Sequence, residues 1–134
     1  MEINEVTGIV VDSALKVHSA LGAGLLEKAY HVCLTHELRK RGLKVLAEVG
    51  LPVEYDGTSI EVGYRIDLLV EDKVIVELKS VSEVLPVHKA QVLTYLRLSR
   101  KEVGLLLNFN STRMKDGIVR IINSAQKTNY GQES

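Results

Sequence analysis

The spacing of apolar residues changes from helical to strand-like near Gly42, so the chain must place helices ahead of a sheet. Upstream, apolar residues recur every three or four positions, as on an amphipathic helix: Ile3, Val6, Val10, Ala14, Val17 and Leu21. Gly22 and Gly24 follow this stripe, and glycine commonly ends helices because it adopts the left-handed conformation easily. A second helix is predicted from Leu25 to Arg41.

Downstream of Gly42 the apolar residues form short runs that are typical of strands. The first predicted strand is broken or bulged near Gly50 and Pro52, and an Asp56-Gly57 turn follows it. Pro86 suits the first turn of a third helix. In chain order the predicted segments are strands 45–55, 59–70 and 73–80, helix 86–100, and strands 103–109 and 118–122. The order ααβββαββ predicts an α/β or α+β fold, with a sheet of about five strands and helices packed on it.

Length and charge exclude several classes of protein. At 134 residues the chain has room for one ordinary domain, which we place at 1–122, followed by a polar C-terminal tail at 123–134. Seventeen basic and seventeen acidic side chains cancel, so the chain is not a general polyanion-coating protein. A single cysteine, Cys33, excludes an internal disulfide framework. No apolar run is long enough to span a bilayer, so we expect a cytoplasmic protein with no membrane partner.

An acidic hairpin carries the first chemical signal. If Glu71, Asp72 and Lys73 form its loop, Val70 pairs with Val74, and Asp67 lies opposite Glu77, with Lys79 on the same face as Glu77. Two carboxylates this close repel each other unless a proton or a cation neutralises them. Mg²⁺ prefers such oxygen ligands, so Asp67, Glu77 and Lys79 suit metal-dependent phosphodiester cleavage. The alternative is a solvent-facing strand with surface ion pairs.

The apolar residues of this hairpin favour a cleft over open solvent. One face is expected to hold Ile66, Leu68, Val70, Val74, Val76 and Leu78. Leu69 and Ile75 make the other face partly apolar as well. A sheet that is covered on both sides and carries charges on one of them indicates a cleft.

The helices add polar candidates to this site. Glu27 lies on the stripe that includes Tyr30 and His31, so it is either functional or a glutamate favoured by the helix dipole. His88, Gln91 and Tyr95 lie one turn apart on the third helix. That helix has no acidic residue and carries four basic ones: Lys89, Arg97, Arg100 and Lys101. Such a surface can hold phosphates, although most basic runs are only solvated faces.

Six short segments in order resemble the GxxExxY proteins, a branch of the PD-(D/E)xK nuclease superfamily. They are Gly24-Leu-Leu-Glu27-Lys-Ala-Tyr30, Gly63-Tyr-Arg-Ile-Asp67, Val76-Glu77-Leu78-Lys79-Ser80, His88-Lys89-Ala90-Gln91, Tyr95-Leu96 and Gly104-Leu-Leu-Leu-Asn-Phe109. The resemblance implies a restriction-endonuclease-like core: a central mixed sheet, the first two helices on one side and the third covering the active-site edge. One departure is Ile66, which stands where many members have proline.

The resemblance also implies residue roles. Asp67, Glu77 and the backbone carbonyl of Leu78 would bind Mg²⁺ or Mn²⁺, and Lys79 would orient the attacking water or offset charge on the phosphate. Glu27 would complete the site through a water or a second ion. Gln91 and Tyr95 match a QxxxY element that supports the lysine and contacts the nucleic-acid backbone, and Lys89, His88 and Arg97 would add phosphate contacts.

The resulting hypothesis is a nuclease that hydrolyses nucleic-acid phosphodiester bonds, with DNA as the expected substrate and Glu27, Asp67, Glu77, Lys79 and Gln91 as catalytic residues. One alternative is a catalytically silent module that binds nucleic acid or a protein partner. Another is a dimeric resolvase of branched DNA, for which a homodimer is expected. Tyr30 and His31 fit either the active site or the core.

Overall fold

The structure is a computed structural model and describes residues 1–126. The helices are α1 (Ile3–Leu21), α2 (Glu27–Lys40) and α3 (Pro86–Ser99). The strands are β1 (Val45–Gly50), β2 (Val53–Tyr55), β3 (Thr58–Ile60), β4 (Arg65–Val70), β5 (Val74–Lys79), β6 (Val103–Asn108) and β7 (Ile118–Ile122). Two short 3₁₀ helices, Met114–Gly117 and Ser124–Gln126, flank β7. The predicted helices and the two final strands are therefore confirmed to within a few residues at their ends.

Five strands form one mixed sheet in the order β1-β4-β5-β6-β7. β5 and β6 are parallel and are joined through α3, whereas the other neighbours are antiparallel. The predicted hairpin register is confirmed, because Val70 pairs with Val74. The expected α/β architecture with a central mixed sheet of about five strands is thus observed.

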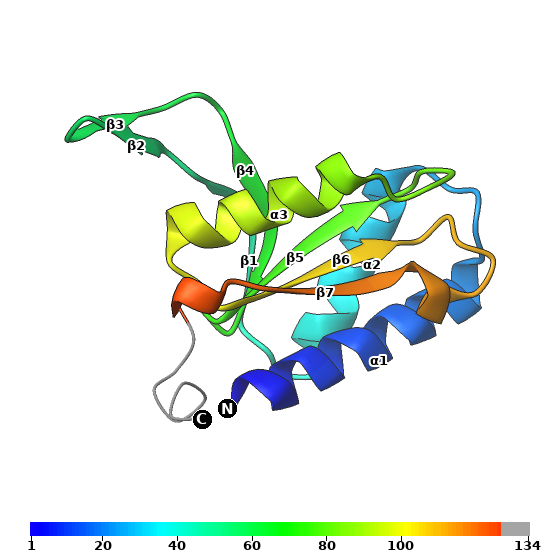
Figure 1. Ribbon diagram of the computed structural model, residues 1–134. Coiled ribbons are helices and arrows are strands. Elements are labelled where there is room, and N and C mark those ends of the chain that lie inside the picture. The colour runs from blue at the N-terminus through cyan, green and yellow to red at the C-terminus, as the bar shows by residue number, and fades with distance from the viewer. Residues whose placement is uncertain (127–134) are drawn as a thin grey trace.

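The segment between β1 and β4 differs from the prediction. The predicted strands 45–55 and 59–70 are each split, and their inner parts pair with each other as a separate β2–β3 hairpin. Figure 1 shows this hairpin projecting beyond the main sheet. Pro52 lacks the N–H that a continuing ladder needs, so the chain leaves the sheet there. Asp56 and Gly57 both have positive φ, at 52° and 72°, which suits a tight hairpin turn.

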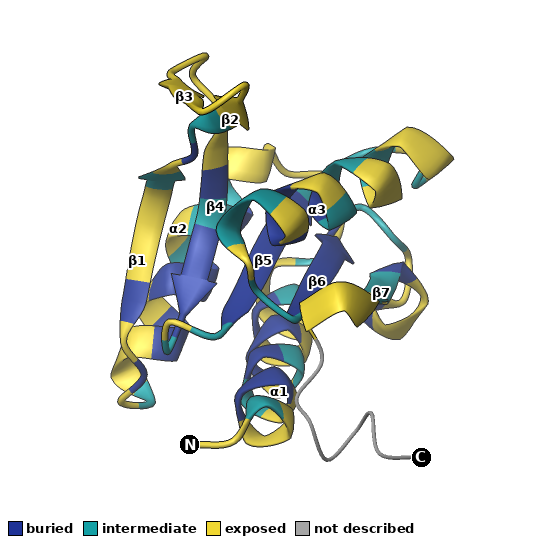
Figure 2. Ribbon diagram, turned by 60° about the vertical axis from the view of Figure 1, so that its left-hand side comes forward, coloured by how far each residue is buried: buried dark blue, intermediate teal, exposed yellow. Residues whose placement is uncertain are grey.

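Helices cover both faces of the sheet, as expected. α1 and α2 pack on one face, where Tyr30, Leu34 and Leu38 join the buried side chains of β4 to β6. α3 lies on the opposite face and packs through Val92, Tyr95 and Leu96 (Figure 1). The buried colouring of β4, β5 and β6 in Figure 2 shows that these strands are the centre of the core.

The prediction of the sheet face on which Ile66 lies was wrong. Ile66 was expected beside Leu68, yet it packs in the cluster on the α3 face, whereas Leu68 packs on the α1–α2 face. The regular pairing of β4 with β5 ends at Leu68 and Val76. Beyond that point side chains of Asp67 and Glu77 take over the hydrogen bonds, so strict alternation does not continue through Asp67.

The predicted tail lies mostly outside the described residues. Its first residue, Asn123, is buried, and its backbone N–H donates to the Glu102 carbonyl at 2.8 Å. Through residue 126, the chain contains no helix with the length and apolar character needed to cross a bilayer.

Candidate metal centre

The carboxylates of Asp67 and Glu77 each accept a hydrogen bond from a backbone N–H of the other residue's strand. The backbone N–H of Asp67 donates to Glu77 Oε1 at 2.9 Å. The N–H of Leu78 donates to Asp67 Oδ2, also at 2.9 Å. The hairpin register places the two residues opposite each other, and these bonds fix both side chains where β4 begins to diverge from β5. Each carboxylate keeps one oxygen that these two bonds do not use.

Burial makes Glu77 electrostatically unusual. Its residue is only 4% exposed. Burial first, and then the charge of Asp67, raise the pKa of Glu77 from 4.5 to about 9, while Lys79 acts in the opposite direction. A divalent cation would reverse this effect, because it stabilises the ionised form of both carboxylates. The pair of buried Glu77 and half-buried Asp67 therefore fits a divalent cation.

Contacts around the C-terminal end of β5 hold Lys79 and the loop that follows it. The N–H of Phe109 donates to the Lys79 carbonyl at 2.9 Å. Asn108 is buried and fixes Val81 twice, accepting from its N–H and donating to its carbonyl. Because Lys79 lies two residues after Glu77 on the same strand, its side chain is directed to the same face as Glu77.

Tyr30 is a core residue that shapes the approach to α2. Its ring is fully buried and stacks on Phe109 with centroids 4.7 Å apart. Its hydroxyl donates to the Gly22 carbonyl at 2.6 Å and accepts from the Leu25 N–H at 3.0 Å. The hydroxyl of Ser80, just after Lys79, donates to the Leu25 carbonyl at 2.8 Å. Gly24, at φ 98°, supplies a conformation that other residues rarely adopt. Tyr30 therefore holds in place the loop that leads into Glu27, the first residue of α2.

Glu27 lies close to the acidic pair. Burial, followed by the charge of Asp67, raises the pKa of Glu27, while Lys79 and His31 lower it. Glu27 also lines a hollow of about 440 Å³ together with Lys28, His31, Val32, Glu48 and Asp67. The structure thus brings Glu27, Asp67, Glu77 and Lys79 together, as the sequence predicted.

A mixed group of ligand-type side chains adjoins the pair. His31, Glu48 and Asp67 each offer one atom, and these atoms all lie within 4.8 Å of one another. Asp67 belongs both to this group and to the pair with Glu77. His31 is therefore only partly buried and lies beside Asp67, outside the hydrophobic core.

The α3 residues divide into those near the pair and those far from it. Tyr95 is buried, and its pKa is raised by burial first and then by the charges of Glu77 and Asp67, while a hydrogen bond with Gln91 lowers it. Tyr95 therefore lies near the acidic pair, and Gln91 lies one turn before it on α3. The ring of Tyr64, just before β4, lies 6.1 Å from that of Tyr95 and adds an aromatic group that the sequence did not single out.

The basic residues predicted to contact nucleic acid are spread along α3. His88 Nδ1 accepts the N–H of Leu85 at 3.0 Å, so this side chain closes the first turn of the helix. Lys89 is exposed one residue later. Arg97 is exposed in the last turn, and Lys101 just beyond it contacts Asp72 in the β4–β5 turn. Arg97 therefore lies toward the opposite end of β5 from Lys79.

A family comparison agrees with this geometry. The model of the family described as "PD-(D/E)XK nuclease superfamily" matches residues 4–121. The chain belongs to the PD-(D/E)XK nuclease superfamily. Members of this superfamily are in general nucleases that hydrolyse phosphodiester bonds and use divalent metal ions.

A comparison of folds finds a solved structure with a similar fold. The structure titled "Crystal structure of SSO0001" superposes with a TM-score of 0.56 at 20% sequence identity. The match covers 84% of this chain and 65% of that one, so this chain spans less than two thirds of its counterpart. At this identity the likeness concerns the fold alone. No curated protein sequence matches the chain.

Sequence reasoning missed Glu48. The β1–β4 pairing runs from Ala47 with Leu68 to Val49 with Ile66, which places Glu48 opposite Asp67. Only a predicted partnership between β1 and β4 would have given this juxtaposition, and no local turn signals it. Glu48 thus lies next to the acidic pair.

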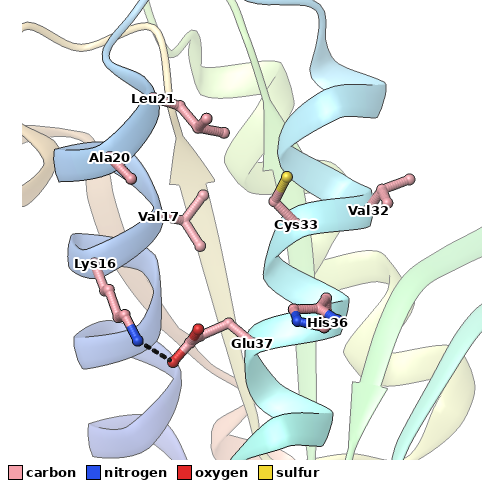
Figure 3. Close-up of a pocket in the computed structure, with 8 residues that line it drawn as sticks. All are labelled: Lys16, Val17, Ala20, Leu21, Val32, Cys33, His36 and Glu37. Carbon is pink, nitrogen blue, oxygen red and sulfur yellow. Dashed lines mark hydrogen bonds and ion pairs between the residues drawn. The ribbon is translucent and has the colours of Figure 1, made fainter.

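A second hollow lies away from the acidic pair. α1 and α2 border a largely apolar space of about 340 Å³ that includes Val17, Ala20, Leu21, Val32 and Cys33. Figure 3 shows that its polar side is closed by the ion pair of Lys16 with Glu37, at 3.2 Å. Asp67, Glu77 and Lys79 do not line this hollow, so it has no part in the candidate metal centre.

Proposed function

We propose that this chain is a metal-dependent nuclease of the GxxExxY branch that hydrolyses nucleic-acid phosphodiester bonds. The observation that carries the proposal is the cross-bonded pair of half-buried Asp67 and buried Glu77, with Lys79 following on the same strand as Glu77. A merely structural role for this pair is disfavoured, because two carboxylates this close, one of them buried, cost stability unless a proton or a cation neutralises them.

The proposed metal ligands are Asp67, Glu77 and the backbone carbonyl of Leu78, with Glu27 acting through a bound water. Mg²⁺ is the expected ion and Mn²⁺ its substitute, since both suit carboxylate and carbonyl ligands. When bound, such an ion polarises the phosphate and lowers the pKa of a water. The hydrogen bond from Leu78 to Asp67 and the one from Asp67 to Glu77 hold the ligand oxygens in place before the ion arrives.

The remaining residues act on the substrate. A water oxygen attacks phosphorus and the water gives up one proton to solvent, the bond from phosphorus to a bridging oxygen breaks, and the leaving oxygen takes up a proton from solvent. Lys79 would orient the water or stabilise the negative charge that develops on the phosphate. Gln91, one helical turn before Tyr95 on α3, would keep Lys79 in place. Tyr95, Lys89 and His88 border the proposed path of the nucleic-acid backbone, and Arg97 would extend it along α3.

Replacing Lys79 by Met tests this proposal without removing a metal ligand. Lys40 is exposed in the last turn of α2, so Lys40→Met serves as the control. The wild type and both variants are incubated with Mg²⁺ and with linear, single-stranded and branched DNA and RNA. We expect cleavage of at least one substrate by the wild type and by the control. We expect loss of that cleavage in Lys79→Met, with the melting curve retained. Equal cleavage by all three would refute the role of Lys79.

The same assay separates the alternatives. Metal-independent binding with no cleavage in Mg²⁺ or Mn²⁺ would support a binding module in place of a nuclease. A preference for branched DNA, together with a dimer by light scattering, would support a junction resolvase. Comparing cleavage of DNA with cleavage of RNA tests directly whether DNA is the substrate, as we expect.

A further inference from the structure

His31, Glu48 and Asp67 come from three different elements, α2, β1 and β4, and meet beside the acidic pair. We propose that these three side chains form a second cation site, with one nitrogen ligand, that takes a divalent transition-metal ion and shares Asp67 with the ion at Glu77. The inference deepens the proposed function, because Asp67 serves both sites, but the binding of the second ion can be measured without any cleavage.

The geometry of the three side chains suits a single ion. Their ligand atoms lie within 4.8 Å of one another, and His31 Nε2 lies 4.0 Å from Glu48 Oε1. Octahedral coordination with metal–ligand bonds of about 2.1 Å brings ligand atoms to roughly 3–4 Å from one another. The Glu48 side chain is 58% exposed, so its rotation can close the small remaining gap.

The position of Glu48 makes this group more than a chance cluster of acidic residues. Glu48 lies between Ala47 and Val49, which pair with the two neighbours of Asp67 on β4. His31 reaches the same point from α2, where its Nε2 lies 3.3 Å from the Asp67 carbonyl oxygen. That contact is long for a hydrogen bond. With the imidazole proton on Nδ1, the lone pair of Nε2 is directed at the ion instead, and the Asp67 carbonyl is a further oxygen within reach.

The ligand chemistry selects the class of ion. Mg²⁺ prefers all-oxygen ligands, whereas transition-metal ions accept an imidazole nitrogen together with carboxylates. The adjoining hollow of about 440 Å³ leaves room for the waters that complete the coordination shell, since each water occupies roughly 30 Å³ in the liquid. Glu27, on the rim of the same hollow, can hold one of these waters.

Mn²⁺ is the probe, because its unpaired electrons report directly on nitrogen ligands. The wild-type protein is titrated with Mn²⁺ and followed by electron paramagnetic resonance, and spin-echo modulation then detects ¹⁴N bound to the ion. We expect two Mn²⁺ ions per chain and ¹⁴N modulation from His31. In His31→Gln the modulation disappears, while in His36→Gln, which lies on the same helix but outside the cluster, it stays.

Glu48→Gln keeps the proposal falsifiable even if His31→Gln unfolds, because Glu48 is exposed. We expect Glu48→Gln to weaken the affinity for the second Mn²⁺ by at least the 10- to 100-fold that is typical of losing a supporting group at a metal site. Absence of ¹⁴N modulation in the wild type, its persistence in His31→Gln, or unchanged binding of two ions in Glu48→Gln would each overturn the proposal. A protein that binds both ions and cleaves no substrate would overturn the proposed nuclease function and leave this site intact.

Discussion

Replacing Glu77 by Gln removes the buried carboxyl group whose raised pKa the metal-centre account uses. Gln keeps the shape of the side chain and can still accept the Asp67 N–H, but it carries no proton that is lost with pH. Because the pKa of Glu77 is raised from 4.5 to about 9, the metal-free folded chain holds this proton more tightly than the unfolded chain does. The stabilisation that this proton gives is present in full below pH 4.5 and is lost progressively as the pH rises toward 9.

The magnitude follows from the pH range. Between pH 5 and pH 8 the unfolded chain releases this proton while the folded chain keeps it, and each pH unit costs about 1.4 kcal/mol. The wild type should therefore lose on the order of 4 kcal/mol of unfolding free energy relative to Glu77→Gln across this range. Titrations of groups that do not contact Glu77 are shared by both proteins and cancel in the comparison.

Urea denaturation in EDTA at pH 5, 6, 7 and 8 measures this difference. We expect the stability of Glu77→Gln relative to the wild type to rise steadily with pH. Adding Mg²⁺ at pH 8 should stabilise the wild type, by about 2.7 kcal/mol at one hundred times the dissociation constant, and should stabilise Glu77→Gln less. Two parallel stability curves, differing by a constant amount at every pH, would refute the argument that burial and Asp67 hold a proton on Glu77.

Two further substitutions test how the fold supports the site. Gly104→Ala would place a Cβ 2.8 Å from a Val92 methyl between β6 and α3, so it should cost about 1–3 kcal/mol in urea denaturation. Its control Gly8→Ala, in α1 with open space around it, should stabilise by roughly 0.5–1 kcal/mol, and equal effects at both positions would contradict the packing argument. Tyr30→Phe should cost about 1–3 kcal/mol through its two lost loop hydrogen bonds, whereas Tyr55→Phe, at an exposed ring, should cost little, and indistinguishable melting curves would contradict this.

Local patterns were sufficient to predict the hairpin and its acidic pair. A three-residue loop between Val70 and Val74 fixes the register, and that register, continued by one residue beyond Leu68 and Val76, brings Asp67 opposite Glu77. The helical stripe of α2 likewise placed Glu27 on the side of the helix that carries Tyr30 and His31, although in the structure Glu27 is exposed at the rim of the hollow. These signals are contained within short stretches of chain, which is why they could be read without a structure.

Contacts between distant segments were not predictable in this way. Glu48 meets Asp67 only because β1 pairs with β4 across an excursion through β2 and β3, and no short pattern encodes that pairing. Ile66 changed faces because side chains replace the backbone ladder at Asp67. The family resemblance supplied roles for Gln91 and Tyr95, but only the structure brought Tyr64 beside them.

Calorimetric titration of Mg²⁺ into the wild type and Asp67→Asn, with cleavage of DNA and RNA measured on the same samples, tests the central claim most directly. Asp67 belongs to both the acidic pair and the cluster with His31, so its carboxylate is the common element of the proposed metal chemistry. We predict that the wild type binds Mg²⁺ and cleaves, and that Asp67→Asn, with its melting curve retained, does neither. Cleavage at the wild-type rate by Asp67→Asn would contradict the account.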